Sequence, residues 1–168
     1  PFVGEHGIEY LFGYCAVDDD LAYKAQWAFS RDDEKSAFES FVDFIMARWE
    51  KFPDMHIYHF AAYEPGALKR LMGRYASREE EIDRMLRAGL FVAVVRHGLR
   101  ASVESYSIKQ LEPFYGYERA TPLHDANVAL ANLQANLELD DAASITDETK
   151  SVVRAYNEDD CRSTSALR

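Results

Sequence analysis

Hydrophobic and polar residues change their spacing several times along the chain, and each change predicts a new element. Aromatic and β-branched residues crowd "GIEYLFGYCAV", residues 7–17, and apolar and polar residues alternate in "LAYKAQWAFS", residues 21–30. These two patterns predict two strands joined as a hairpin. In residues 32–52, Phe38 and Ile45 belong to an apolar stripe at helical spacing, behind acids that suit a first helical turn. The N-terminal third is therefore expected to be a β-hairpin followed by a long helix.

Beyond residue 52 the pattern is mostly helical. Pro65 stands where the first turn of a helix accepts proline, Ser77 and Glu80 form a capping-box pattern, and Thr146 is an N-cap candidate for the last helix. The expected elements are a strand at 56–61, helices at 63–76 and 77–88, an extended run at 90–95, and helices at 105–116, 123–139 and 146–168. This order predicts an α/β or α+β domain with a small sheet.

Composition narrows the function classes. The chain has 168 residues, 48% of them hydrophobic, which suits one domain spanning residues 1–168. Its 29 acids against 19 bases give a net charge of −10, so a general electrostatic grip on nucleic acid is not expected, although a local basic strip can serve. Cys15 and Cys161 have no metal-type spacing and form no evident disulfide framework, which predicts a reducing, cytoplasmic compartment.

The ends of the chain and its apolar runs carry further expectations. No run approaches the roughly 20 apolar residues of a membrane span, so no membrane partner is expected. The chain starts at Pro1 without Met and stops at Arg168 within a predicted helix, so we expect it to be a piece of a longer protein.

The last helix carries the first candidate for chemistry. Tyr156 and Asp160 are four residues apart, which places them roughly 40° apart around the helix axis and about 6 Å apart along it, near the apolar stripe. Asp159 and Glu158 are expected to point progressively away. A carboxylate beside an apolar stripe is costly to bury unless it is paired or binds a cation. Spacing alone leaves a chance pairing open, because Tyr-x-x-x-Asp also occurs at residues 14–18 on a predicted strand.

The second acid is Glu64, between a predicted strand and the start of the next helix. A carboxylate at such a junction is well placed for ligand chemistry. The other interpretation is that Glu64 only complements the helix dipole. His56 and His59 flank the same strand, and we expect them to be structural rather than metal ligands.

Three segments now become informative together: "YHFAAYEPGALKRL", "ESYSIKQLEPFYGYER" and "YNEDDCRST". In this order and at these separations they resemble the ribonuclease-H-like exonuclease domain of the DEDDy type. More narrowly, they are similar to the YprB-like branch of bacteria, whose members are often fused to RecB-like nuclease and superfamily 1 helicase modules. The resemblance covers residues 7–168. It implies an α/β, ribonuclease-H-like fold with a small mixed sheet flanked by helices.

The resemblance also implies a metal-dependent 3′→5′ exonuclease that acts on the 3′ ends of single-stranded DNA or RNA. The family holds two divalent ions, Mg²⁺ or Mn²⁺, with four acids, and hard oxygen ligands suit these ions. By the match, Glu64 and Asp160 bind metal, Tyr156 orients the attacking water, and Asp159 is a weaker third ligand. Two such ions can activate the water and stabilise the leaving 3′-oxygen.

The resemblance and the charge pattern suggest residues that contact nucleic acid. Ser107 and Lys109 belong to "SYSIK", a stretch that lies near the substrate strand in relatives. Lys69 and Arg100 are candidates for a basic strip that tracks phosphates. The other interpretation of each is ordinary surface charge. The remaining candidates for this strip are Arg70, Arg74 and Arg96.

The chain departs from the family pattern at its first motif, Asp-x-Glu on the first strand. Glu5 and Glu9 have no Asp two residues before them, and Pro1 stands just past the point where the motif should end. We therefore expect the motif, and the central strand that carries it, upstream of Pro1. The direct step from Val92 to Ala93, where relatives often have an acid, is a second departure.

Two other functions stay open. A non-catalytic nucleic-acid-binding or docking domain would keep the fold and lack the first motif. An unrelated α/β interaction domain would have Glu64 and Asp160 more than about 10 Å apart, too far for a shared two-metal site.

Overall fold

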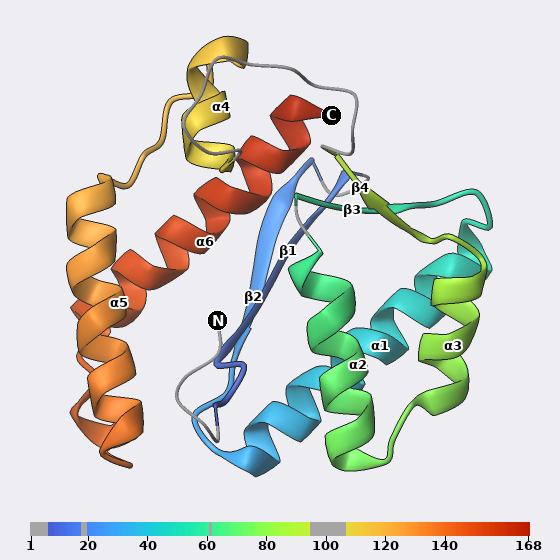
Figure 1. Ribbon diagram of the computed structural model, residues 1–168, viewed down its shortest axis with the longest axis horizontal. Helices are drawn as coiled ribbons and strands as arrows, with labels where there is room; N and C mark the ends of the chain where they lie inside the picture. The colour runs from blue at the N-terminus through green and yellow to red at the C-terminus, as the bar shows by residue number, and fades with distance from the viewer. Residues whose placement is uncertain (1–6, 18–19, 61, 95–106) are drawn as a thin grey trace.

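A β-hairpin runs through the middle of the structure, with helices on both sides of it (Figure 1). The computed structural model describes residues 7–17, 20–60, 62–94 and 107–168. Strands β1 (Leu11–Ala16) and β2 (Ala22–Trp27) pair antiparallel, with Leu11 opposite Trp27. The alternating pattern predicted this hairpin, but the paired strands are shorter than the patterned segments.

The two faces of β1 pack on different helices, because successive strand residues point to opposite sides. Tyr14 stacks on Phe44 of α1 (Arg31–Lys51), with ring centroids 4.9 Å apart. Gly13 faces α6 (Asp147–Leu167) on the other side. A side chain at position 13 would collide with Asn157 of α6 and Tyr23 of β2, so glycine permits the close approach of α6 to the strand.

A second pair of strands lies beside the end of the hairpin. Strand β3 (Ile57–His59) pairs parallel with β4 (Phe91–Ala93). The connection between them contains α2 (Tyr63–Tyr75) and α3 (Glu79–Arg87), in keeping with the long crossover that a parallel pair requires. The described strands thus include both antiparallel and parallel pairing, as two separate two-stranded sheets.

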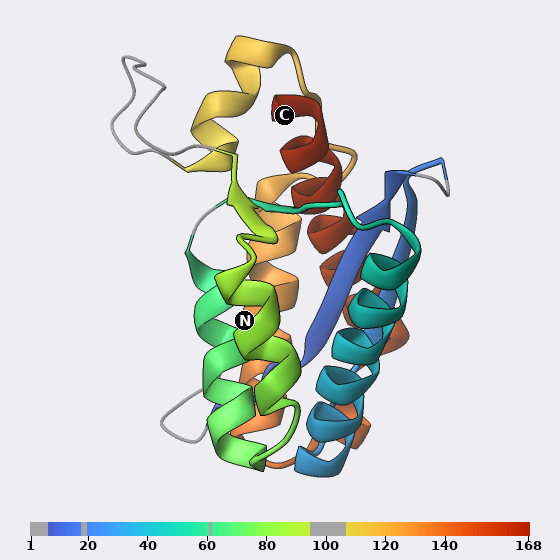
Figure 2. The same cartoon turned by 90° about the vertical axis from the view of Figure 1, so that its right-hand side faces the viewer.

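Helices lie on both sides of the hairpin (Figure 2), and a hydrophobic core forms on each side. On one side α1, α2 and α3 bury Phe38, Leu71 and Met85. On the other, α5 (Leu123–Glu138) and α6 bury Leu133 and Val153. Each such side chain contributes about 1.5–3 kcal/mol when fully buried. The apolar side chains of α5 and α6 therefore hold α6 against the hairpin.

The helix caps confirm one sequence prediction and correct another. Thr146 caps α6, and its hydroxyl accepts a hydrogen bond from the Thr149 backbone N–H. The capping box predicted at Ser77 is wrong: α3 begins after Arg78, whose backbone is left-handed with φ 59° and which makes no side-chain cap. Ser77 instead donates its hydroxyl to Glu39 on α1, so a tertiary partner has replaced the local one.

The remaining elements complete the path to α6. Helix α4 (Ile108–Tyr115) contains Pro113, and its C-cap is Gly116 with φ 69°. A 3-10 helix, η2 (Ala142–Ser144), connects α5 to α6. Among the described helices, none is long and apolar enough to span a membrane.

Candidate active site

The C-terminal half of α6 meets α4 and the loop that follows it (Figure 1). Tyr156 and Asp160 lie one turn apart on this part of α6, and two cations connect them. The Tyr156 ring centroid is 4.9 Å from Lys109 Nζ and 5.3 Å from Arg119 Cζ. The same two side chains contact Asp160 Oδ1, Arg119 Nη2 at 2.6 Å and Lys109 Nζ at 3.5 Å. The predicted pair is thus one unit with two cations beside it.

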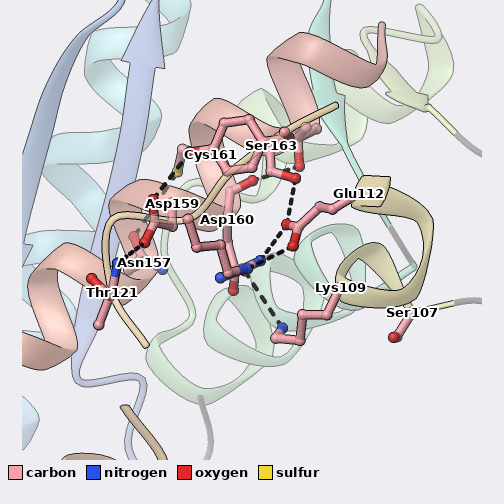
Figure 3. A network of polar contacts seen from close by, with 12 residues as sticks. Ser107, Lys109, Glu112, Thr121, Asn157, Asp159, Asp160, Cys161 and Ser163 are labelled. Carbon is pink, nitrogen blue, oxygen red and sulfur yellow. Dashed lines mark hydrogen bonds and ion pairs between the residues drawn. The ribbon is translucent and has the colours of Figure 1, made fainter. Parts of the chain in front are cut away.

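Arg119 is held in place by a second acid, Glu112 of α4. Its Nε and Nη2 donate to the two Glu112 oxygens at 2.9 and 2.7 Å, and both side chains are more than nine-tenths buried. Ser163 of α6 donates to Glu112 Oε1 at 2.6 Å and hydrogen-bonds Tyr115 (Figure 3). Burial alone would lower the pKa of Arg119, but hydrogen bonds with Glu112 and Asp160 raise it above its usual range.

Asp160 is only partly occupied by these contacts. Its side chain is 33% exposed, and both cations lie on Oδ1. Within the described part of the chain, Oδ2 makes no hydrogen bond. Asp160 therefore has one oxygen available to a further ligand.

Its neighbour Asp159 is in a different environment, and the prediction that it points away from the protein is wrong. Asp159 is buried, and its oxygens accept hydrogen bonds from the backbone N–H of Thr121 at 2.9 Å and of Ala120 at 3.2 Å. The Tyr117 hydroxyl donates to it as well, at 3.1 Å. Burial and the Asp159 charge raise the pKa of Tyr117 well above its usual range, so this hydroxyl remains a donor. Helical geometry could not reveal this, because the partners come from the loop after α4.

Glu64 lies in the first turn of α2, shortly after the end of β3. Its side chain is 52% exposed, and one oxygen is 3.6 Å from Nδ1 of the buried His59. The hydrogen bond with Cys15 and burial raise the pKa of the Cys161 thiol most, and the charges of Asp160 and Glu64 raise it further. Both charges therefore act on the same thiol.

Glu64 and Asp160 supply two exposed or half-exposed carboxylates, the hard oxygen donors that Mg²⁺ and Mn²⁺ prefer. Among the described residues, no group of three or more His, Cys, Asp or Glu could hold a metal ion. By the resemblance, Glu64 and Asp160 would be two of the four acids of a two-metal site. His59 is buried, and its ring centroid lies 6.2 Å from that of Phe91, as expected for a structural histidine. His56 is exposed.

The candidate nucleic-acid contacts are spread over the structure. Ser107 is the N-cap of α4 and lies apart from the polar network, whereas Lys109 belongs to it (Figure 3). Lys69 is exposed on α2, and Arg100 lies outside the described residues. Two other members of the predicted basic strip form ion pairs within the protein. Arg70 contacts Glu9 at 2.8 Å, and Arg74 contacts Glu34 at 2.8 Å.

Sequence reasoning missed Arg119 and Glu112. Both occur in the segment "ESYSIKQLEPFYGYER", but neither was among the predicted site residues. Arg119 and Asp160 are 41 residues apart along the chain, and no local periodicity connects them.

Comparison with protein families adds one finding. The family model of the RNase H superfamily matches residues 1–168, and the chain belongs to that superfamily. The comparisons with curated proteins and with solved structures give no match. Membership confirms the RNase H-like α/β fold and supports nuclease-type activity on nucleic acid in general, with divalent metals as the usual cofactors of such nucleases.

Proposed function

We propose that this member of the RNase H superfamily is a metal-dependent 3′→5′ exonuclease of the DEDDy type, in the YprB-like branch. The observation that carries the proposal is the Tyr156–Asp160 pair on α6, in which Asp160 keeps one oxygen clear of its two cations. Glu64 is the second acid, in the first turn of α2 after β3, a strand that contacts α6. The substrate is the 3′ end of a single-stranded DNA or RNA.

Each residue has a part in this proposal. Glu64 and Asp160 would hold the divalent ions, Mg²⁺ or Mn²⁺, and bound ions activate water and stabilise the leaving 3′-oxygen. Tyr156 orients the attacking water from beside Asp160. Lys109, 30% exposed, offers its ammonium to a phosphate of the strand. Asp159 is the weaker ligand candidate, because both of its oxygens already accept hydrogen bonds.

Further parts of the site are proposed from the resemblance and from the charge pattern. The resemblance implies two further acids, from an Asp-x-Glu motif. Ser107, Lys69 and Arg100 are proposed to contact the strand. We also propose that helicase or RecB-like nuclease modules of the same polypeptide deliver single-stranded ends to this domain in the cytoplasm.

The test is degradation of 3′ ends by the full-length protein with Mn²⁺, on single-stranded DNA and on RNA labelled at the 5′ end. We expect Asp160→Asn to lower the rate by at least about 100-fold, because it removes a charged metal ligand. Glu158→Gln is the matched control: Glu158 lies on the same helix and pairs only with Arg162 among the described residues, so its rate should stay within about twofold. Equal rates in wild type and Asp160→Asn would contradict the proposal.

One observation favours a second function, a nucleic-acid-binding domain without catalysis. Arg119 and Lys109 both lie on Asp160, and no group of three metal-ligating residues is found in the described ranges. This function predicts that the protein binds a labelled oligonucleotide but leaves it intact with Mn²⁺ present. It also predicts that Asp160→Asn does not weaken that binding.

A further inference from the structure

We propose that Arg119, gripped by Glu112, is a positioning residue that holds Asp160 in the orientation from which it binds a divalent cation. The inference rests on the proposed function and extends it to two residues outside the Tyr–Asp pair. Arg119 acts through Asp160 and not on the substrate, since its side chain is only 8% exposed.

The geometry of the guanidinium supports a holding role. Its Nε and Nη2 form a fork on the two Glu112 oxygens, and Nη2 also donates to Asp160 Oδ1. A planar guanidinium that is hydrogen-bonded at two atoms has one orientation. The contacts with Glu112 alone therefore fix the position of Nη2. Asp160 Oδ1 is thereby held 2.6 Å from Arg119 Nη2, and Oδ2 remains available to another ligand.

Side chains of α4 and α6 hold Glu112 in place. Glu112 belongs to α4 and is buried, and Ser163 of α6 donates to it at 2.6 Å. Tyr115 of α4 hydrogen-bonds Ser163 at 2.6 Å. Because Ser163 stands almost one turn beyond Asp160 on the same helix, the network ties Arg119 to the helix that carries the acid it holds.

Lys109 provides an internal contrast. It contacts the same oxygen of Asp160, but at 3.5 Å, from a side chain that is 30% exposed. An ammonium on a flexible stem exchanges partners easily, whereas a buried fork does not. We therefore assign the two cations different roles: Lys109 is an exchangeable counter-charge, and Arg119 sets the position of the carboxylate.

The two roles predict effects of opposite sign on metal affinity. Any cation beside a metal ligand opposes the binding of a second cation, so if charge alone mattered, removing either residue would tighten Mn²⁺ binding. If Arg119 positions Asp160, its loss leaves the carboxylate free to rotate. Loss of a residue that orients a metal ligand weakens metal binding by about 10–100-fold.

The experiment is a Mn²⁺ titration of the full-length protein by calorimetry, without nucleic acid. The binding event assigned to this site is the one that Asp160→Asn removes. We expect Arg119→Gln and Glu112→Gln to weaken that event by about 10–100-fold, and Lys109→Met to tighten it by about two- to fivefold. Arg119→Lys keeps the charge but not the fork, so it should weaken binding as well.

The outcomes separate the two proposals. Unchanged or tighter Mn²⁺ binding in Arg119→Gln and Arg119→Lys would overturn the positioning role and leave the metal site intact. The absence of any Mn²⁺ binding that depends on Asp160 in the wild type would overturn the proposed function, and the positioning role with it. If the Arg119→Gln protein does not fold, as judged by circular dichroism, Glu112→Gln and Arg119→Lys decide the question.

Discussion

The networks around Glu34 and around Asp160 both combine acids with arginines, but they differ in how fully the central carboxylate is satisfied. Glu34 on α1 is completely buried and accepts hydrogen bonds from Tyr75, from Arg31 at 2.9 Å and from Arg74 at 2.8 Å, with a backbone N–H as a further donor. Asp160 on α6 is 33% exposed, and the contacts of its side chain lie on one oxygen within the described part of the chain.

The difference teaches what each acid does. The Glu34 network joins α1, α2 and the segment before β1. If the carboxylate were lost, then within the described residues the two arginines would keep only the Gly7 carbonyl and Tyr75 only the Arg31 carbonyl, and the Glu9 backbone N–H would lose its acceptor. The adjacent Glu9 works in the same way, accepting from Tyr63 at 2.6 Å and Arg70 at 2.8 Å. A closed network of this kind stabilises the fold, whereas the open one at Asp160 retains the capacity to bind a ligand.

The largest test of this comparison is Glu34→Gln. We expect the free energy of unfolding to fall by about 3 kcal/mol, because the change breaks a buried ion-pair network and leaves arginines without their partner. Urea denaturation measures the loss. A loss below about 1 kcal/mol would show that the closed network contributes no more than a surface ion pair.

Asp159→Asn is expected to have the next largest effect. Both oxygens of Asp159 accept hydrogen bonds, whereas within the described residues only one oxygen of its neighbour Asp160 does. An amide keeps one acceptor but sets its NH₂ group against a backbone N–H of the loop 117–121. We expect a loss of about 2 kcal/mol in the free energy of unfolding. Glu158→Gln, at the preceding position of α6, should change it by less than about 0.5 kcal/mol. Equal effects of the two variants would contradict the burial of Asp159 as the cause.

A pH series sharpens the role of the Glu34 charge. Burial opposes ionisation of Glu34, but hydrogen bonds from Tyr75, the Glu9 backbone N–H, Arg74 and Arg31 lower its pKa below the ordinary value. Its stabilising contribution is therefore complete above the ordinary glutamate pKa of about 4.3 and is lost as the pH falls through its own lower pKa. The stability gap between wild type and Glu34→Gln should therefore shrink as the pH falls through that range. A gap that is constant from pH 6 to 3 would mean that the charge is not what matters.

The smallest expected effect on stability is that of Asp160→Asn. Arg119 keeps its fork on Glu112, and Lys109 is exposed enough to be hydrated, so we expect a change below about 0.5 kcal/mol in thermal or urea unfolding. The same variant is expected to lose activity, which separates function from stability at this position. A loss as large as that of Glu34→Gln would remove the distinction between the two networks.

Prediction from sequence succeeded where one element decides the geometry. Tyr156 and Asp160 share a face because a helix repeats every 3.6 residues, and the same two cations contact both of them. Prediction failed for Asp159, which was judged from its own helix although its partners belong to the loop after α4. It failed at Ser77 for a similar reason, since Glu39 of another helix takes the hydroxyl.

The sequence by itself determined the hairpin, the helices, the Tyr–Asp pair and the position of Glu64 at a helix start, because these follow from local periodicity, caps and steric preferences. Only the tertiary structure decided that Arg119 contacts Asp160, that Glu112 holds Arg119, and that Asp159 and Asp160 have opposite environments. Those contacts depend on how α4, α6 and the loop between α4 and α5 pack together. Arg119 and Asp160, 41 residues apart along the chain, meet because α4 packs against α6.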